Sequence, residues 1–344
     1  MKVFVTGGCG FLGSHVCEYF IKQGHKVVSY DNMTKYELLR VGYGADESRN
    51  YNWNFLKSIG VELIKEDIID FNSLREYLKG ADFIIHCAAQ PAMTISIEDP
   101  KLDFYTNVIG TFNLLQIARE YKIPMVSCGT IHIYGNKIND TLVEKKSRYI
   151  RFPASIDESH PVSEGILTPL HASKRAAELY LETYIKTYKI NAASFRLTGI
   201  YGTRQFGGED HGWVANFSIR AIMNRMIKVF GTGKQLRDIV YAEDVAEACH
   251  AFYLNGKPGI YNIGGGEEFS ISLLECIDLI SDFIGKKPQV KFEKGRLGDL
   301  LYFVCNIDKA KKDLKWYPKT PPKEGIKKLI NWINNERKLF KVSN

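Results

Sequence analysis

A glycine-rich turn between a strand-like run and a helix-like run constrains the fold of this chain most. The run KVFVTG (2–7) is short, apolar and β-branched, and FLGSHVCEYFIKQG (11–24) has helical apolar spacing and a terminating glycine. Between them, GGCGFLG supplies Gly7, Gly10 and Gly13. Glycines in this place allow a tight turn and a close approach of the backbone to a pyrophosphate at the helix N-terminus. The pattern therefore predicts the first unit of a dinucleotide-binding fold.

The carboxylate that ends the next strand-like run, HKVVSYD (25–31), indicates which dinucleotide is bound. Asp31 would accept hydrogen bonds from the ribose hydroxyls of adenosine and would repel a 2′-phosphate, which favours NAD over NADP. Lys35 lies close by in the sequence and argues in the other direction. A glycine turn that only helps a helix to pack on a strand would explain the glycines but not the carboxylate. We therefore expect NAD as the cofactor.

The first half of the chain alternates apolar strands with helices, which predicts a doubly wound α/β fold. Near-continuous apolar strands separated by helices form parallel sheets that are covered on both faces. Residues 32 to 59 interrupt the pattern as an insertion, for which we expect an irregular flap with a short helix. The expected elements are strands at 61–67, 81–89, 124–130 and 191–197, and helices at 102–121 and 169–188.

The second half is less regular and predicts a smaller lobe. Glycine-rich loops and short elements follow residue 197, and KTPPKEG (319–325) precedes a last amphipathic helix. We expect the dinucleotide-binding domain to span 1–197, with 237–262 returning to it. Residues 198–236 and 263–344 would then form the substrate lobe.

Composition narrows the class of partner. The formal net charge is +7, but the basic residues occur in short, scattered pairs, which suits a phosphorylated small molecule better than a nucleic acid. Seven cysteines are scattered without CxxC spacing, which indicates reduced thiols and no zinc or other metal site. No stretch approaches the roughly 18 apolar residues of a membrane span. We expect a cytoplasmic protein with no membrane partner.

With the glycine turn and Asp31 in place, the chain resembles the extended short-chain dehydrogenase/reductase family, the NAD-dependent nucleotide-sugar epimerases and dehydratases. The resemblance covers nearly the whole length and includes GGCGFLGSH, DNMT, HCAAQ, NVIGTFNLL, FRLTGIYG and VYAEDVAEA. Within the family it is closest to the CDP-paratose (CDP-tyvelose) 2-epimerases, through QPAMTISIEDP (90–100), GTRQFGGEDHGW (202–213) and FGTGKQLRD (230–238). It implies a nucleoside-diphosphate sugar as substrate, with CDP favoured, and a homodimer or homotetramer.

The resemblance also implies which residues contact NAD. They are Gly7, Gly10, Phe11, Leu12, Gly13, Asp31, Asn32, Asp67, Ile68, Ala88, Ala89, Gln90, Asn107 and Lys174.

The catalytic motif of the family is incomplete in TPLHASKRAAELY (168–180). Family members carry a Ser or Thr after the fifth strand and a Tyr four residues before a Lys; the phenolate takes the proton of a sugar hydroxyl and the lysine lowers its pKa. Thr130 and Lys174 match two of these positions, but Leu170 stands in the place of the tyrosine. Leucine cannot move a proton, so the usual mechanism cannot operate unchanged.

Three residues are candidates for the missing proton transfer. His132 follows Thr130 by two positions, and alternation on an extended segment would place both on one side. A loop histidine satisfied by its surroundings is the competing interpretation. His171 adjoins Leu170, but a rotation of about 100° per helical residue turns it away from Lys174. Cys128 is better interpreted as a core residue.

Three arginines are candidates for binding the substrate. Arg237 resembles the arginine that pairs with the diphosphate in the family, a group that suits a planar bidentate donor. Arg204 and Arg296 are weaker candidates, for which surface ion pairs are the competing interpretation. A later arginine of the phosphate segment is replaced by Leu301.

The sequence predicts an epimerase that transiently oxidises a sugar hydroxyl, similar to a CDP-tyvelose 2-epimerase. The first alternative is a nucleotide-sugar dehydrogenase or another epimerase of the family with relocated acid and base groups. The second is a catalytically silent protein that binds NAD and a nucleotide sugar, an interpretation that Leu170 favours. The joint presence of Asp31, Thr130, Lys174 and Arg237 favours chemistry.

Overall fold

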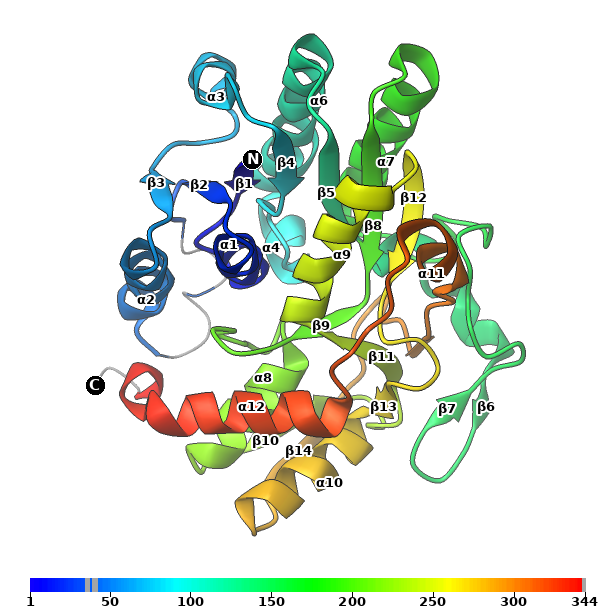
Figure 1. Ribbon diagram of the computed structural model, residues 1–344. Coiled ribbons are helices and arrows are strands. Elements are labelled where there is room, and N and C mark those ends of the chain that lie inside the picture. The colour runs from blue at the N-terminus through cyan, green and yellow to red at the C-terminus, as the bar shows by residue number, and fades with distance from the viewer. Residues whose placement is uncertain (35–37, 39–42, 342–344) are drawn as a thin grey trace.

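A seven-stranded parallel sheet forms the centre of the larger domain (Figure 1). The computed structural model describes residues 1–34, 38 and 43–341. The chain builds one side of the sheet outwards from β1 and then crosses back to the other side of β1. This reversal opens a crevice at the carboxyl ends of β1 and β4. The strands lie in the order β12 (Gly259–Ile263), β8 (Ala192–Leu197), β5 (Met125–Thr130), β4 (Phe83–His86), β1 (Lys2–Thr6), β2 (Lys26–Tyr30) and β3 (Glu62–Ile64).

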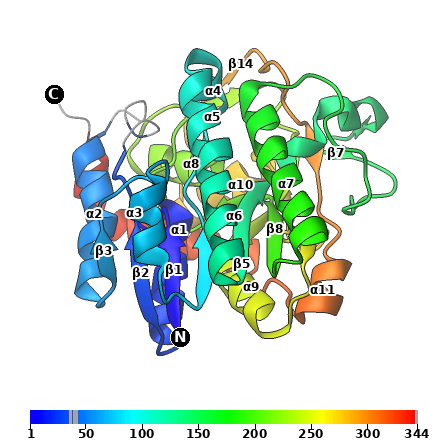
Figure 2. The same ribbon diagram turned by 90° about the horizontal axis from the view of Figure 1, so that it is seen from above.

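Helices cover both faces of this sheet (Figure 2). Side chains alternate along a strand, and β1 shows the consequence: Val3 and Val5 pack with one set of helices, and Phe4 packs with the other. The predicted doubly wound α/β class is confirmed. The first set comprises α1 (Phe11–Lys22), α2 (Ala45–Ser58), α9 (Ala242–Asn255) and α11 (Asp308–Leu314), and the second α3 (Phe71–Leu78), α6 (Gly110–Tyr121) and α7 (Pro169–Tyr188).

Two segments differ from the expectation. The helix predicted over 102–121 is divided into α5 (Pro100–Phe104), one π turn at Tyr105–Ile109, and α6. The π turn carries Asn107. The insertion after β2 contains α2, which has 14 residues and is therefore longer than the short helix predicted there. Lys35 lies outside the described residues.

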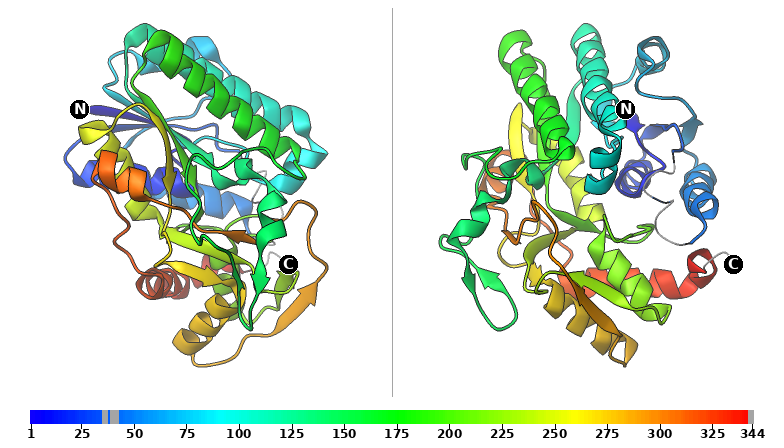
Figure 3. Two further views of the ribbon diagram at one scale, coloured as in Figure 1. Left: turned by 90° about the vertical axis from the view of Figure 1, so that its right-hand side faces the viewer. Right: turned by 180° about the vertical axis from the view of Figure 1, so that it is seen from behind.

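The smaller lobe lies at the carboxyl edge of the large sheet (Figure 3). Its core is formed by apolar faces of three helices and the strands beside them. The predicted return segment 237–262 is divided between the two parts. Its first residues belong to β11, a strand of a mixed sheet in the lobe, whereas α9 packs on the large sheet and β12 is one of its strands. The lobe contains α8 (Trp213–Ile222), α10 (Leu273–Ile284), α12 (Pro322–Asn335), and strands β9 (Gly199–Tyr201), β10 (Ile227–Phe230), β11 (Leu236–Tyr241), β13 (Ser270–Ser272), β14 (Val290–Glu293) and β15 (Tyr302–Phe303).

Shorter elements complete the chain. They are α4 (Met93–Glu98), the hairpin β6 (Val143–Glu144) and β7 (Tyr149–Ile150), and 3-10 turns at Ile131–Tyr134, Asn136–Thr141 and Arg337–Phe340.

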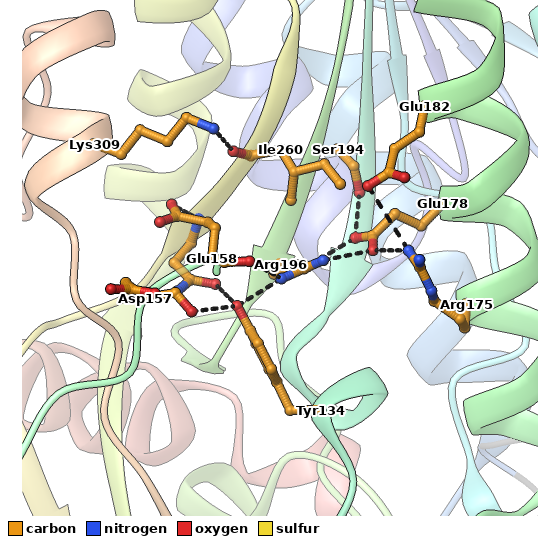
Figure 4. A network of polar contacts seen from close by, with 11 residues as sticks. Tyr134, Asp157, Glu158, Arg175, Glu178, Glu182, Ser194, Arg196, Ile260 and Lys309 are labelled. Atoms are coloured by element: carbon orange, nitrogen blue, oxygen red, sulfur yellow. Dashed lines mark hydrogen bonds and ion pairs between the residues drawn. The ribbon is translucent and has the colours of Figure 1, made fainter. Parts of the chain in front are cut away.

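A buried ion pair fastens α7 to the sheet (Figure 4). Glu178 of α7 receives two hydrogen bonds from Arg196 of β8, at 2.8 Å to Oε1 and 3.0 Å to Oε2. Each side chain is only 4% exposed. The same guanidinium donates to the hydroxyl of Tyr134 at 2.7 Å. The pair therefore joins α7 to the 3-10 turn that follows β5.

Candidate functional site

The glycine turn after β1 has no room for a side chain at Gly7 or Gly13. Gly7 has a φ of +68°, and a Cβ there would lie 2.6 Å from the backbone nitrogen of Ala88. A Cβ on Gly13 would lie 2.1 Å from the carbonyl oxygen of Gly7. Gly10 is the N-cap residue of α1. The turn therefore brings β1, β4 and the start of α1 together without side chains between them, which is the cradle that a pyrophosphate requires.

A first cavity of about 330 Å³ opens beside this turn. Most of the residues predicted to contact NAD line it together. These are Gly7, Gly10, Phe11, Leu12, Asp31, Asn32, Asp67, Ile68, Ala88, Ala89 and Gln90.

Two carboxylates, those of Asp31 and Asp67, line the first cavity and make hydrogen bonds there. Asp31 accepts hydrogen bonds from the backbone N–H groups of Cys9 at 2.9 Å and Met33 at 2.8 Å. The amide of Asn32 donates to Asp67 Oδ2 at 2.8 Å. The carboxylate of Asp31 is thus fixed at the wall of the cavity, where a ribose would meet it. The glycine cradle and this carboxylate together fit NAD.

Three predicted contacts, Gly13, Asn107 and Lys174, do not line the first cavity within the described part of the chain. Asn107 is buried and binds Gln90 instead: its Oδ1 accepts from the backbone N–H at 3.0 Å, and its Nδ2 donates to the carbonyl at 3.1 Å. It therefore shapes the loop that lines the cavity. Gly13 acts through the packing of α1 on the turn.

Helix α2 adds two residues that the sequence analysis did not identify. The side-chain amide of Asn52 donates to the carbonyl oxygens of Cys9 at 3.1 Å and Gly10 at 3.3 Å. Arg49 brings a guanidinium to the same wall of the first cavity. The only sequence signal was their polar character within an insertion, which also fits an exposed helix.

A second cavity, of about 390 Å³, lies between the sheet edge and the smaller lobe. It is lined by Thr130, His132, Arg237 and Arg296. The two cavities share Phe11, Pro91, Gln205, His211 and Gly212, so they meet at one edge.

Arg237 and Arg296 differ in their surroundings. Arg237 donates to the backbone carbonyls of Leu236 and Leu300 and has no carboxylate partner among the described residues. Burial lowers its pKa. Arg296 lies over the ring of Phe230, 3.9 Å from its centroid, and 3.5 Å from a carboxylate oxygen of Asp210. Arg237 is therefore the cation with more capacity to bind an anion.

Arg204 lies elsewhere. It lines the first cavity and not the second, and its guanidinium binds Glu18 at 2.6 Å and the hydroxyl of Ser14 at 3.1 Å. These partners on α1 bind its Nε and one of its two amino groups. The structure therefore does not bring Arg204 together with the other two arginines.

Thr130 and His132 reach the second cavity by a route that the sequence analysis did not foresee. The segment after Thr130 is a 3-10 turn and not an extended strand, so the predicted alternation of side chains is wrong. Thr130 caps this turn, and its Oγ1 accepts the backbone N–H of His132 at 3.2 Å. The hydroxyl of Thr130 donates no hydrogen bond to any described residue, so its O–H can donate one to a ligand.

The ring of His132 is partly exposed, and its nitrogens make no hydrogen bond to any described residue. Burial, then the charge of Arg237 and the neighbouring His171, lower the pKa of His132 to about 3. The imidazole is therefore neutral at physiological pH, and the same causes make it a weak base while the charge of Arg237 is uncompensated.

Lys174 and Leu170 stand one helical turn apart on α7. Burial lowers the pKa of Lys174, and the neighbouring Cys128, Asp103 and Cys87 act in the opposite direction. Of these neighbours, Cys87 lines the first cavity. Leu170 is buried, and its backbone N–H donates to the hydroxyl of Ser96 at 3.1 Å.

No group of three His, Cys, Asp or Glu side chains suited to a metal ion occurs within the described ranges. Within the same ranges, no helix has both the length and the apolar composition needed to cross a bilayer.

The fold and the glycine cradle define a Rossmann-type NAD-binding protein. The sequence model of the NAD-dependent epimerase/dehydratase family matches residues 3–264, and the chain belongs to this family. It is 32% identical to the CDP-paratose 2-epimerase of Salmonella typhi, over 97% of this chain and all of that one. It is 30% identical to a UDP-glucose 4-epimerase of Mycolicibacterium smegmatis, over 98% and 99% of the two chains.

A solved structure has the same fold. The UDP-glucose 4-epimerase of Thermus thermophilus in complex with NAD is 31% identical, with a TM-score of 0.78 over 98% of this chain and all of that one. NAD dependence is thus common to the fold, the family and this relative.

The position of Asp31 predicts a test of cofactor choice. The native protein should bind NAD(H) more tightly than NADP(H), because the carboxylate would repel a 2′-phosphate. Asp31→Asn removes the charge and keeps one acceptor oxygen, enough for the N–H of either Cys9 or Met33, and should narrow the preference for NAD(H) over NADP(H). Fluorescence titration with both reduced cofactors measures it. Tighter binding of NADPH by the native protein would contradict this role of Asp31.

Proposed function

We propose that this protein is an NAD-dependent nucleotide-sugar epimerase that transiently oxidises a sugar hydroxyl. The observation that carries the proposal is the meeting of the two cavities, with the glycine cradle and Asp31 in one and Thr130, His132 and Arg237 in the other. When bound, NAD supplies the group that accepts a hydride from the sugar carbon and returns it.

Each residue of the site has a proposed task. Thr130 donates a hydrogen bond to the reacting sugar hydroxyl. His132 takes the proton of this hydroxyl on a ring nitrogen and later returns it, in place of the tyrosine that Leu170 replaces. Lys174, which has no hydrogen bond or ion pair with any described residue, holds the ribose of the cofactor.

Arg237 and Arg296 bind the diphosphate of the substrate, and Arg204 supports α1. The charge of Arg237 also bears on His132. A diphosphate that neutralises Arg237 removes one cause of the low pKa of His132 and makes the imidazole a stronger base when the substrate is bound.

A CDP-linked sugar is the substrate that we favour. The similarity to the CDP-paratose 2-epimerase supports this choice, together with the residues 90–100, 202–213 and 230–238 that carry the resemblance. The similarity to UDP-glucose 4-epimerases makes UDP-sugars the necessary comparison. Incubation with CDP-, UDP- and dTDP-sugars, followed by NMR of the products, tests the choice.

A silent NAD- and nucleotide-sugar-binding protein is the second candidate, because Leu170 provides no proton carrier. It predicts binding of both ligands with no chemical change. Calorimetry beside the NMR assay separates it from the epimerase.

We also propose a homo-oligomer. Exposed apolar side chains occur on α5, the π turn and α7, among them Phe104, Tyr105, Leu179 and Tyr180. Burying such side chains between copies removes apolar surface from water. Light scattering of the purified protein gives the mass. A monomer at micromolar concentration would contradict the proposal.

Arg237→Ala should weaken substrate binding more than it lowers turnover. A hydrogen bond to a charged group contributes about 1.5–3 kcal/mol, so KM should rise roughly 10–100-fold. Steady-state kinetics with the active nucleotide sugar measures this. Lys145→Ala, which removes an equal charge from an exposed position, is the control. An unchanged KM would remove Arg237 from the substrate site.

A further inference from the structure

A second histidine lies against His132. His171 belongs to the first turn of α7, beside Leu170, and its ring centroid is 5.8 Å from that of His132 at an interplanar angle of 81°. The rotation that turns His171 away from Lys174 turns it towards the 3-10 turn that carries His132. The two imidazoles therefore meet beside the position where the phenol of the family is missing.

The helix cap fixes the ring of His171. Its Nδ1 accepts the backbone N–H of Thr168 at 3.0 Å and lies 2.8 Å from the hydroxyl oxygen of the same residue. A nitrogen that accepts an N–H carries no proton, so the proton of the neutral ring is on Nε2. His171 is 3% exposed. It fills the place that Glu or Gln takes in a capping box, the third residue after the N-cap threonine.

His132 has no comparable restraint. Within the described chain its ring has no hydrogen bond, and its one aromatic contact is with His171. A base that must face a sugar hydroxyl needs a defined ring orientation, because the rate of proton transfer depends on geometry. The capped ring of His171 is the part of the structure that can define it.

We propose that His171 is a positioning residue for His132: its ring, packed against the His132 imidazole, holds that imidazole in the orientation that reaches the substrate. This inference rests on the proposed epimerase function. It assigns two different jobs to one residue, capping of α7 and support of the base.

Two substitutions separate these jobs. His171→Gln keeps a side chain that can accept the N–H of Thr168, as in an ordinary capping box, but removes the ring. His171→Phe keeps a ring against His132 but removes the acceptor. We expect kcat to fall roughly 10–100-fold in His171→Gln with little change in KM or in NAD affinity. His171→Phe should retain most of kcat despite a lower melting temperature.

The pH profile gives a readout that a capping role alone would not change. Because His171 is one cause of the low pKa of His132, the acid limb of kcat should move to higher pH in His171→Gln. The other charged or titratable side chains that line the cavity of His132 stay unchanged; they are Glu209, Asp210, His211, Lys228, Arg237, Arg296 and Asp299. Native kcat and an unmoved acid limb in His171→Gln would overturn the inference. Equal loss of kcat in both variants would also overturn it, because a ring alone would then not suffice.

NMR of the histidine rings tests the pair without turnover. The carbon-bound ring protons of His132, assigned with His132→Ala, should change their shifts in His171→Gln and broaden if the ring becomes mobile. Unchanged His132 signals would overturn the inference even in an active enzyme. Absence of turnover on every nucleotide sugar, with changed signals, would count against the proposed function and leave the ring contact supported.

Discussion

Replacing His132 by alanine should lower turnover by about 10²–10⁴-fold, the usual effect of removing a general acid or base. Binding of NAD and of the nucleotide sugar should change much less, because Arg237 and the glycine cradle remain. Turnover should depend on His132 because its ring lines the second cavity and has no hydrogen-bond partner in the described chain. Single-turnover and steady-state kinetics on the active sugar measure the loss.

Two further variants complete this test. His25→Ala, at a histidine that lines neither cavity in the described chain, is the control and should keep native turnover. Leu170→Tyr restores the phenol of the family and should recover part of the loss in the His132→Ala background or shift its pH profile. Native turnover in His132→Ala would disprove the relocated base.

Glu178→Gln should cost about 3–5 kcal/mol of unfolding free energy, because it leaves the buried guanidinium of Arg196 without its counter-charge. Both side chains are 4% exposed, so water cannot replace the lost carboxylate. Glu178 also accepts hydrogen bonds from Arg175 at 2.8 Å and Ser194 at 3.2 Å, which would be weakened as well. Urea unfolding followed by circular dichroism gives the difference.

Glu182→Gln is the matched control on the same helix. Glu182 lies 3.8 Å from Arg175, and both side chains are 24% exposed. Exposed pairs of this kind contribute about 0–1 kcal/mol. If the two variants lose similar stability, the buried pair does not fasten α7 in the way described.

The first cavity could be predicted from the sequence because its signals are local. Gly7 and Gly13 are required by contacts with Ala88 and with the turn itself, and the spacing of the glycines carries this information. Asp31 directly follows β2, the second strand of the chain. A short pattern of glycines, a strand and a carboxylate therefore describes much of the cradle.

Other parts of the site, in both cavities, depend on contacts that a sequence does not display. Arg204 lies in a promising motif, but its partner is Glu18, 186 residues away, and the ion pair decides its role. Arg49 and Asn52 belong to an insertion whose helix packs on the glycine turn. The contact of His132 with His171 joins residues 39 positions apart across a 3-10 turn that alternation could not predict.

The central claim is tested most directly by NMR of a nucleotide-sugar panel incubated with the NAD-loaded protein in D₂O. We predict conversion of one sugar to its epimer, with no deuterium at the inverted carbon and no net NADH, because the hydride returns to the carbon that it left. Net NADH would indicate a dehydrogenase instead, and loss of water with deuterium uptake would indicate a dehydratase. Binding of the sugars without any chemical change would contradict the account and support the silent binder.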